Sequence, residues 1–114
     1  RNISVTATAV RVPVMGGHSE SINLTLEKSF DLIEVKELLA QSKGIVLEDD
    51  PENFKYPMPI NARGKDEVFV GRIREDFSCE NSLNLWVVSD NLRKGAATNA
   101  IQILETIISK GFIN

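Results

Sequence analysis

The sequence predicts an α+β fold in which a mixed, largely antiparallel sheet is covered on one face by helices. Three observations lead to this class. Several short segments alternate apolar and polar residues with a period of two, as half-buried strands do. Two longer segments repeat their apolar residues every three or four positions, as amphipathic helices do. The chain has 114 residues, of which 42% are hydrophobic and 25% are charged, a balance typical of one globular domain.

The first strand is expected over residues 3–14, where Ile, Val, Thr and Ala dominate and the alternation changes phase near Arg11. Residues 15–17, Met-Gly-Gly, interrupt this run. A second alternating run follows over residues 22–26. We expect the two runs to pair as a hairpin.

A helix is expected between Ser29 and Gly44. Asp31 is a suitable N-cap, and Glu34 follows three residues later, as in a capping box. Gly44 supplies a residue that commonly ends helices.

The rest of the sheet is expected from residues 44–48, residues 67–77 and the segment LNLWVV at residues 83–88. The last two should form an antiparallel pair. Residues 49–66 contain three Pro and no periodicity, so they predict a long loop. Gly71 has no companion glycines and therefore indicates a close backbone approach within a strand rather than a phosphate-binding loop.

The last element is expected to be a helix that begins at Asp90 or Asn91 and ends near Gly111. Its apolar face consists of Ala97, Ile101, Leu104 and Ile108. A helix start with free N–H groups, in the segment SDNLRKGAATNA, suits the anionic edge of a nucleotide. An ordinary capped surface helix is the alternative.

Composition excludes several functions. The net charge is −3 and no Lys/Arg-rich run occurs, so we expect no nucleic-acid or membrane partner. No apolar run approaches the roughly 18 residues that span a bilayer, and no leader segment opens the chain, which predicts a cytoplasmic protein. With one Cys and one His, neither a disulfide framework nor a structural metal site is expected.

The stretch RVPVMGGHSE carries the two strongest candidate site residues. His18 is the lone imidazole of the sequence, a side chain suited to proton transfer, and the two glycines before it allow its backbone to approach a ligand. The alternative is a solvated loop residue. Arg11 lies in an apolar strand, where a guanidinium needs a carboxylate or phosphate partner. Its alternative is a salt bridge within the chain. We expect both side chains to point into one pocket.

Cys79 invites a role as nucleophile. Its surroundings, FSCEN, contain neither a helix N-terminus nor a cationic group that would lower the pKa of a thiol. We therefore expect Cys79 to fill a turn rather than to react.

Three stretches together carry a resemblance to a known family: RVPVMGGHSE, the Pro-rich DDPENFKYPMP, and GKDEVFVGRIRED with NSLNLWVVSDNLRKGAATNA. They resemble the C-terminal part of aspartate-semialdehyde dehydrogenase, almost end to end. That family reduces 4-phospho-L-aspartate to L-aspartate 4-semialdehyde and phosphate through a cysteine thioester, with NADPH as hydride donor, in the biosynthesis of lysine, threonine and methionine. The resemblance implies the C-terminal-domain fold of the glyceraldehyde-3-phosphate dehydrogenase-like proteins.

The resemblance also implies roles for particular residues. His18 would be the acid/base group, and Arg11 would bind the α-carboxylate of the substrate. Asn91, Gly95 and Gln102 would lie near NADP. No metal is implied.

The domain organisation follows from the same resemblance. Residues 1–89 would form a partial substrate-binding and dimerisation domain, and residues 90–114 a C-terminal helix that rejoins the nucleotide-binding domain. The nucleophilic cysteine and the Gly-rich NADP-binding segment would precede this chain, so the chain alone should be inactive. We also expect a homodimer through the sheet face.

The sequence departs from the family at two positions. Many members have MRGHSE where this chain has Met15-Gly16-Gly17-His18, which removes a cation next to the histidine. Cys79 stands where Val is usual. Two further readings remain open: a noncatalytic dimerisation module, and a related acyl-phosphate reductase acting on another amino acid.

Overall fold

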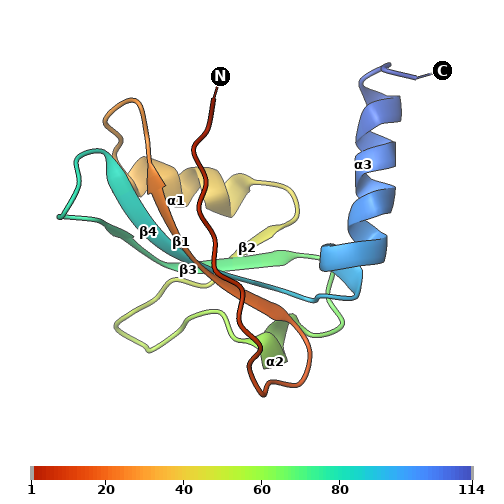
Figure 1. The fold of residues 1–114 in the computed structure, drawn as a ribbon, viewed down its shortest axis with the longest axis horizontal. Coiled ribbons are helices and arrows are strands. Elements are labelled where there is room, and N and C mark those ends of the chain that lie inside the picture. Colours follow the sequence, from red (N-terminus) through yellow and green to blue (C-terminus); the bar gives the residue numbers. More distant parts are fainter. Residues whose placement is uncertain (1, 114) are drawn as a thin grey trace.

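The computed structural model describes residues 2–113, and it confirms the predicted α+β class. The elements follow in the order β1 (His18–Thr25), α1 (Leu32–Gln41), β2 (Ile45–Leu47), α2 (Pro59–Ala62), β3 (Val68–Glu75), β4 (Ser82–Ser89), the π-helical turn η1 (Arg93–Ala97) and α3 (Thr98–Ser109). The strands form one sheet in the order β1-β4-β3-β2 (Figure 1). The β2–β3 pair is parallel, and the other two pairs are antiparallel, as predicted for β3 and β4.

Helix α1 begins as the capping pattern predicts. One carboxylate oxygen of Asp31 accepts hydrogen bonds from the backbone N–H groups of Ile33, at 2.6 Å, and Glu34, at 3.2 Å. These bonds satisfy donors that the first turn of a helix leaves free. The helix packs its apolar side chains onto one face of the sheet, where Val70, Ile73 and Leu83 are buried.

The opposite face of the sheet is covered only in part. Here Ala62 of α2 packs against Phe69 of β3 and Val88 of β4, and all three are buried. The prediction of an irregular loop over residues 49–66 is therefore wrong at its end, because this loop contains a helical turn. Pro59 stands at its first position, where the fixed φ of proline favours helix and no N–H is required.

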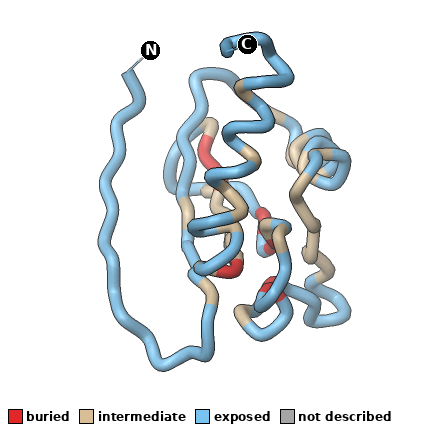
Figure 2. The backbone as a smooth tube through the Cα atoms, turned by 90° about the vertical axis from the view of Figure 1, so that its right-hand side faces the viewer, coloured by how far each residue is buried: buried red, intermediate tan, exposed pale blue. Residues whose placement is uncertain are grey.

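The predicted strand over residues 3–14 is wrong. This segment has no regular secondary structure, and its residues are exposed. Figure 2 shows it as an extended tube set apart from the rest of the chain. Alternation of side chains favours an extended backbone, but a strand also needs a hydrogen-bonded neighbour. None of the strands within residues 2–113 pairs with this segment, so the predicted hairpin does not form and β1 pairs with β4 instead.

The predicted C-terminal helix is confirmed, with one difference. The chain after Asp90 first makes the π-helical turn η1 and continues as α3 to Ser109. Figure 1 shows α3 projecting away from the sheet. Its apolar residues remain largely open to solvent, with exposures of 59% for Ile101, 49% for Leu104 and 55% for Ile108. The apolar stripe is therefore present without a cover from residues 2–113.

The predicted close approach at Gly71 is confirmed. A Cβ atom at this position would overlap the carbonyl oxygen of Glu48 and lie 2.6 Å from Cδ of Pro57. The strand β3 is irregular just beyond it, because its register with β4 shifts between Gly71 and Arg74. At Arg72 the backbone has a φ of 53°, and the guanidinium lies 5.3 Å from the centre of the Tyr56 ring.

Candidate functional site

His18 is the first residue of β1, directly after the two glycines. Both glycines have positive φ values, 77° at Gly16 and 84° at Gly17, a conformation that favours glycine. A Cβ on Gly17 would lie 3.3 Å from both the Cβ of Pro59 and the carbonyl oxygen of Ser89. We call Gly16-Gly17 the hinge. It needs glycine both for its backbone conformation and because a side chain at Gly17 would be crowded. It places His18 next to the end of β4, opposite Ser89 in the register.

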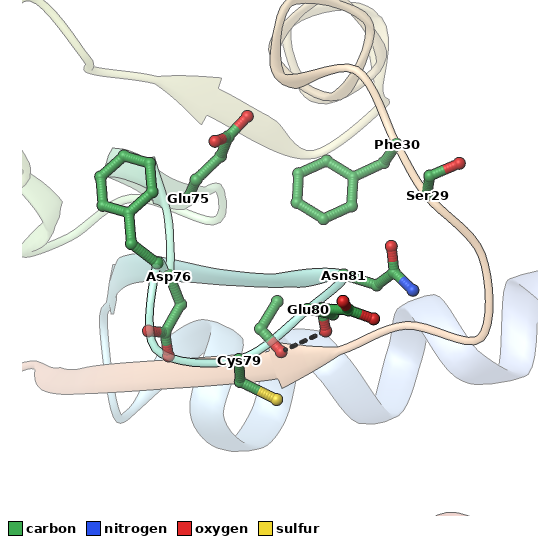
Figure 3. A pocket seen from close by; sticks show the side chains of 9 residues that line it. Ser29, Phe30, Glu75, Asp76, Cys79, Glu80 and Asn81 are labelled. Carbon is green, nitrogen blue, oxygen red and sulfur yellow. Dashed lines mark hydrogen bonds between the residues drawn. The ribbon is translucent and has the colours of Figure 1, made fainter.

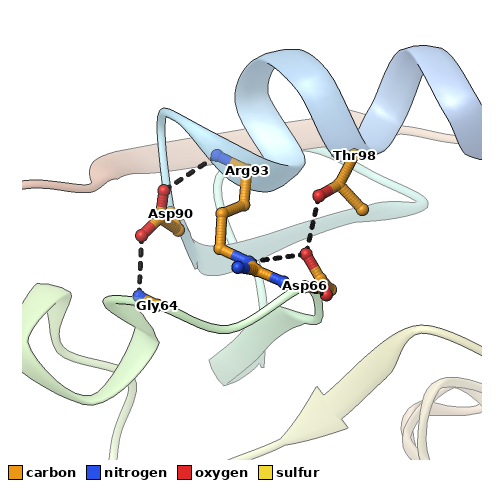
Figure 4. Close-up of polar contacts among 5 residues, drawn as sticks. All are labelled: Gly64, Asp66, Asp90, Arg93 and Thr98. Carbon is orange, nitrogen blue, oxygen red and sulfur yellow. Dashed lines mark hydrogen bonds and ion pairs between the residues drawn. The ribbon is translucent and has the colours of Figure 1, made fainter.

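The turn after β4 is built around Asp90, which is only 6% exposed. Its Oδ1 accepts hydrogen bonds from the N–H groups of Leu92, at 2.8 Å, and Arg93, at 2.9 Å. Its Oδ2 accepts a hydrogen bond of 2.7 Å from the N–H of Gly64, which follows α2 (Figure 4). These hydrogen bonds lower the pKa of Asp90. The bond from Gly64 has the largest effect, and the bond from Arg93 the next largest. This carboxylate ties the start of η1 to the loop after α2.

Asn91 and Gly95 lie beside the histidine. Oδ1 of Asn91 accepts a hydrogen bond of 2.8 Å from the N–H of Gly17. A Cβ on Gly95 would lie 3.9 Å from Nδ1 of His18, and the N–H of Gly95 donates to the carbonyl of Asp90 at 2.9 Å. Three of the residues named from the sequence, His18, Asn91 and Gly95, therefore occupy one place.

Gln102 lies further along, on α3. Its Oε1 accepts a hydrogen bond of 2.7 Å from Nζ of Lys94, which also donates to Oδ1 of Asn99 at 3.3 Å. The amide of Gln102 is thus engaged by the η1 turn rather than directed at His18.

The structure does not bring Arg11 to His18. Arg11 lies in the exposed segment before β1 and has no hydrogen-bond or ion-pair partner within residues 2–113. The alternative to a substrate-binding role, a salt bridge within the chain, is therefore not formed by this part of the chain. A pocket shared with His18 stays a prediction.

A second polar cluster joins the loop before β3 to the start of α3. Arg93 donates from Nε to Oδ1 of Asp66 at 2.8 Å and from Nη2 to Oδ2 at 2.6 Å. The hydroxyl of Thr98 donates to the same Oδ1 at 2.7 Å (Figure 4). These hydrogen bonds lower the pKa of Asp66 from 3.8 to about 2. The bond from Arg93 has the largest effect, and the bond from Thr98 the next largest. The bidentate ion pair between Arg93 and Asp66 orients η1 relative to the sheet.

This cluster predicts how the free energy of unfolding depends on pH. The carboxyl of Asp66 has a lower pKa when folded, about 2, than its ordinary value of 3.8. Its contribution to stability is therefore complete above about pH 4 and is lost as the pH falls towards about 2. Asp66→Asn should lack this part of the pH dependence, measured as urea midpoints between pH 7 and pH 2.5.

Thr98→Val is the matched comparison for that experiment, because it removes one hydrogen bond to Asp66 and keeps the ion pair with Arg93. It should show an intermediate pH dependence. An Asp66→Asn variant with the same acid sensitivity as the parent chain would contradict the assignment.

Two open hollows lie elsewhere on the surface. One, of about 300 Å³ (Figure 3), is lined by Ser29, Phe30, Glu75, Asp76, Phe77, Cys79, Glu80, Asn81 and Ser82. The other, of about 420 Å³, is lined by Glu48, Asn53, Phe54, Lys55, Tyr56, Met58 and Asn61. Neither includes His18 or Arg11. Cys79 lies in the turn region between β3 and β4, as predicted, and is exposed at the first hollow. That it does not react stays a prediction.

Two further findings concern residues 2–113. In this part of the chain no group of three or more His, Cys, Asp or Glu side chains is arranged to hold a metal ion. No helix there has the length and apolar character needed to cross a membrane.

Sequence reasoning missed three contacts that shape the site. Asp90 was expected only as a helix cap, and nothing in the sequence indicates its bond to Gly64. The pairing of Asp66 with Arg93 joins residues 27 positions apart, a separation that carries no local pattern. Arg63 approaches the hinge, since its Cδ lies 3.8 Å from where a Cβ of Gly16 would be.

Known proteins share this fold. The crystal structure of aspartate semialdehyde dehydrogenase II from Vibrio cholerae in complex with ASA superposes with a TM-score of 0.78 and 42% identity, over 88% of this chain and 29% of that one. The aspartate semialdehyde dehydrogenase from Candida albicans with NADP has a TM-score of 0.69 and 30% identity, over 90% of this chain and 32% of its own.

These likenesses place the molecule in the class of dehydrogenase domains with a mixed sheet. Residues 1–94 match the family described as semialdehyde dehydrogenase, dimerisation domain. The chain belongs to this family. It is also 54% identical over 112 residues to the aspartate-semialdehyde dehydrogenase of Aquifex aeolicus, covering 98% of this chain but only 33% of that protein. The chain thus spans about a third of the length of this relative, and the resemblance seen in the sequence is confirmed.

Proposed function

We propose that the chain is the C-terminal part of an NADP-dependent aspartate-semialdehyde dehydrogenase, which converts 4-phospho-L-aspartate to L-aspartate 4-semialdehyde and phosphate. The observation that carries this proposal is the meeting of His18 with Asn91 and Gly95, because it unites the candidate acid/base group with two candidate cofactor contacts. The similarity to dehydrogenases solved with ASA and with NADP supports it.

The residues at this place fit a nicotinamide cofactor. The Nδ2 amide of Asn91 has no partner within residues 2–113, because only its Oδ1 is engaged. Gly95 presents backbone without a side chain, so a flat ring can approach closely. Gln102 fits less directly, since its Oε1 is held by Lys94. When bound, NADP exchanges a hydride with the substrate carbon.

The chain's own residues would bind the substrate and move a proton. Arg11 would hold the α-carboxylate through its planar pair of N–H donors. His18 would give a proton to the carbonyl oxygen of the thioester as it is reduced, and would take that proton back when the thiolate leaves and the aldehyde carbonyl forms. In the reverse direction the same two transfers would run in the opposite order. The thiolate that forms the thioester would come from outside these 114 residues, because we assign Cys79 no such role.

The test is an assay of the longer dehydrogenase chain that contains these residues. With aspartate semialdehyde, phosphate and NADP it should form NADPH, measured by absorbance, and the 114-residue chain alone should not. A longer chain that folds and binds NADP but shows no turnover would favour the noncatalytic dimerisation module. Sustained turnover by the 114-residue chain would overturn our assignment of the thiol.

We also propose that the chain forms a homodimer through the sheet face opposite α1. On that face Ser21 stands opposite Trp86 in the register, and beside them Asn23 donates to Oδ1 of Asn84 at 3.0 Å. Helix α2 covers only the part of this face near Phe69. Both faces of the sheet carry apolar side chains. The face that α1 does not cover therefore needs a second layer, which another copy of the chain would supply.

Light scattering on the longer chain should give the mass of a dimer. Ser21→Arg should shift the protein towards monomer, because it places a bulky charge on the open face. Glu20→Arg is the matched control, since it adds the same side chain one residue away, on the face that α1 covers, where Glu20 is opposite Val87. Equal dissociation by the two variants would contradict this choice of face.

A further inference from the structure

We propose that Asn91 is a positioning residue for His18, acting through the backbone of Gly17. This inference rests on the proposed function of His18 as the acid/base group. It gives Asn91 a task separate from contact with a cofactor.

The hydrogen bond between Gly17 and Asn91 has one possible direction. A backbone N–H can only donate, so the side-chain atom that faces Gly17 must be the amide oxygen of Asn91, at 2.8 Å. The two residues are 74 positions apart in the chain. This single bond therefore links the hinge before β1 to the turn after β4, next to the histidine.

The hinge requires such a link because it consists of two glycines in the left-handed region. Glycine samples more backbone conformations than any other residue, so an unanchored Gly16-Gly17 pair would leave His18, at the start of β1, held on one side only, by the pairing of β1 with β4. Pro59 and Ser89 limit Gly17 on two sides by contact. The bond from Asn91 adds direction, because it fixes where the N–H of Gly17 points.

Asn91 is itself held in place. The preceding residue, Asp90, is buried and accepts three backbone hydrogen bonds, from Gly64, Leu92 and Arg93. These bonds fix the turn from which the side chain of Asn91 extends. Rigid support of this kind is what a positioning group needs.

Among the described residues, no carboxylate performs this task for the imidazole. Both oxygens of Asp90 are occupied by backbone donors. The ring of His18 has no hydrogen-bond partner within residues 2–113, and the residue is exposed. Its position in this part of the chain is therefore set through the backbone, by the pairing of β1 with β4 on one side and by the bond from Gly17 to Asn91 on the other.

The experiment compares Asn91→Ala, Asn91→Asp and His18→Asn in the longer dehydrogenase chain. Asn91→Ala removes the acceptor, whereas Asn91→Asp keeps an oxygen that can accept from Gly17. Asn53→Ala is the matched control, because the side-chain amide of Asn53 bonds within its own loop, to Asp50, and to nothing else among residues 2–113. Each variant is measured for kcat, for the KM values of semialdehyde and NADP, and for the imidazole NMR signal of His18, which is assigned by its loss in His18→Asn.

Asn91→Ala should lower kcat by about 10-fold to 10²-fold, the scale of a small misplacement of a catalytic group. The KM for semialdehyde should stay within about twofold, and the imidazole signal of His18 should shift or broaden. The KM for NADP should rise to a similar extent in Asn91→Ala and Asn91→Asp, because both lose the Nδ2 group proposed to contact the cofactor. Asn91→Asp should recover most of kcat, while Asn53→Ala should match the parent enzyme. A merely structural role would not be rescued in this way.

Three outcomes would overturn the inference. One is a rise in the KM for NADP with unchanged kcat, which would make Asn91 a cofactor contact only. Another is an unchanged imidazole signal in Asn91→Ala. The third is an Asn91→Asp variant no better than Asn91→Ala. Full activity of His18→Asn would instead refute the proposed function, and the NMR signal would still show whether Asn91 positions His18.

Discussion

Replacing His18 by Asn in the longer dehydrogenase chain should lower kcat by about 10² to 10⁴, the usual contribution of a positioned acid/base group. Asparagine has a similar size and can hydrogen-bond, but it does not take up a proton near neutral pH. The KM for semialdehyde should change little, because the imidazole acts on the reacting oxygen rather than holding the carboxylate. Steady-state kinetics of NADPH formation provide the measurement.

Arg11→Lys supplies the contrasting variant. Lysine keeps the charge but loses the bidentate hydrogen bonding to a carboxylate. The KM for semialdehyde should therefore rise, while kcat changes less. Arg63→Lys is the matched control, because Arg63 is the arginine that approaches the hinge at Gly16.

If Arg63→Lys raises KM and Arg11→Lys does not, the carboxylate contact belongs to Arg63. A His18→Asn enzyme within a few-fold of the parent kcat would remove His18 from the mechanism.

Local signals in the sequence predicted the elements whose stabilising contacts are themselves local. The helix cap at Asp31 is an example, because its bonds reach only two and three residues ahead. The antiparallel pair β3–β4 is another, since its strands are adjacent in the sequence and joined by a short turn. Gly71 was also predictable, because an isolated glycine in a strand has few physical explanations.

The failures have a different cause. The alternation in residues 3–14 resembles that of a half-buried strand, but pairing depends on a neighbour that no pattern within the segment specifies. For α2, a turn of four residues is too short to show a period, and it is stabilised by the packing of Ala62 on Phe69. In both cases tertiary contacts decide the local structure.

The candidate site shows the same division. Glycines before a lone histidine identified the hinge from the sequence alone. The bond from Gly17 to Asn91 joins residues 74 positions apart, and no pattern in either segment of the sequence indicates it. Arg11 was named from its apolar surroundings, yet the structure leaves the segment around it exposed, because none of the strands within residues 2–113 pairs with this segment.

The largest effect on stability is expected from Gly71→Ala. The added methyl group would overlap the carbonyl oxygen of Glu48 and crowd Cδ of Pro57 at 2.6 Å. Glu48 cannot easily retreat, since its N–H donates to the carbonyl of Val70 at 2.8 Å. Pro57 is fully buried, and its carbonyl accepts the indole N–H of Trp86 at 3.0 Å.

Because both neighbours are fixed, β3 must move away from the loop or distort. Overpacking of this kind costs about 1–3 kcal/mol, and we expect Gly71→Ala to reach about 3 kcal/mol in the free energy of unfolding, measured by urea denaturation. Gly95→Ala is the control, because its nearest contacts would be ordinary ones of 3.5–3.9 Å, and alanine is favoured over glycine in helical backbone by about 1 kcal/mol. It should therefore be neutral or stabilising. If Gly71→Ala unfolds at the same urea concentration as the parent chain, β3 and the loop at Glu48 can separate without cost, and this contact does not hold them together.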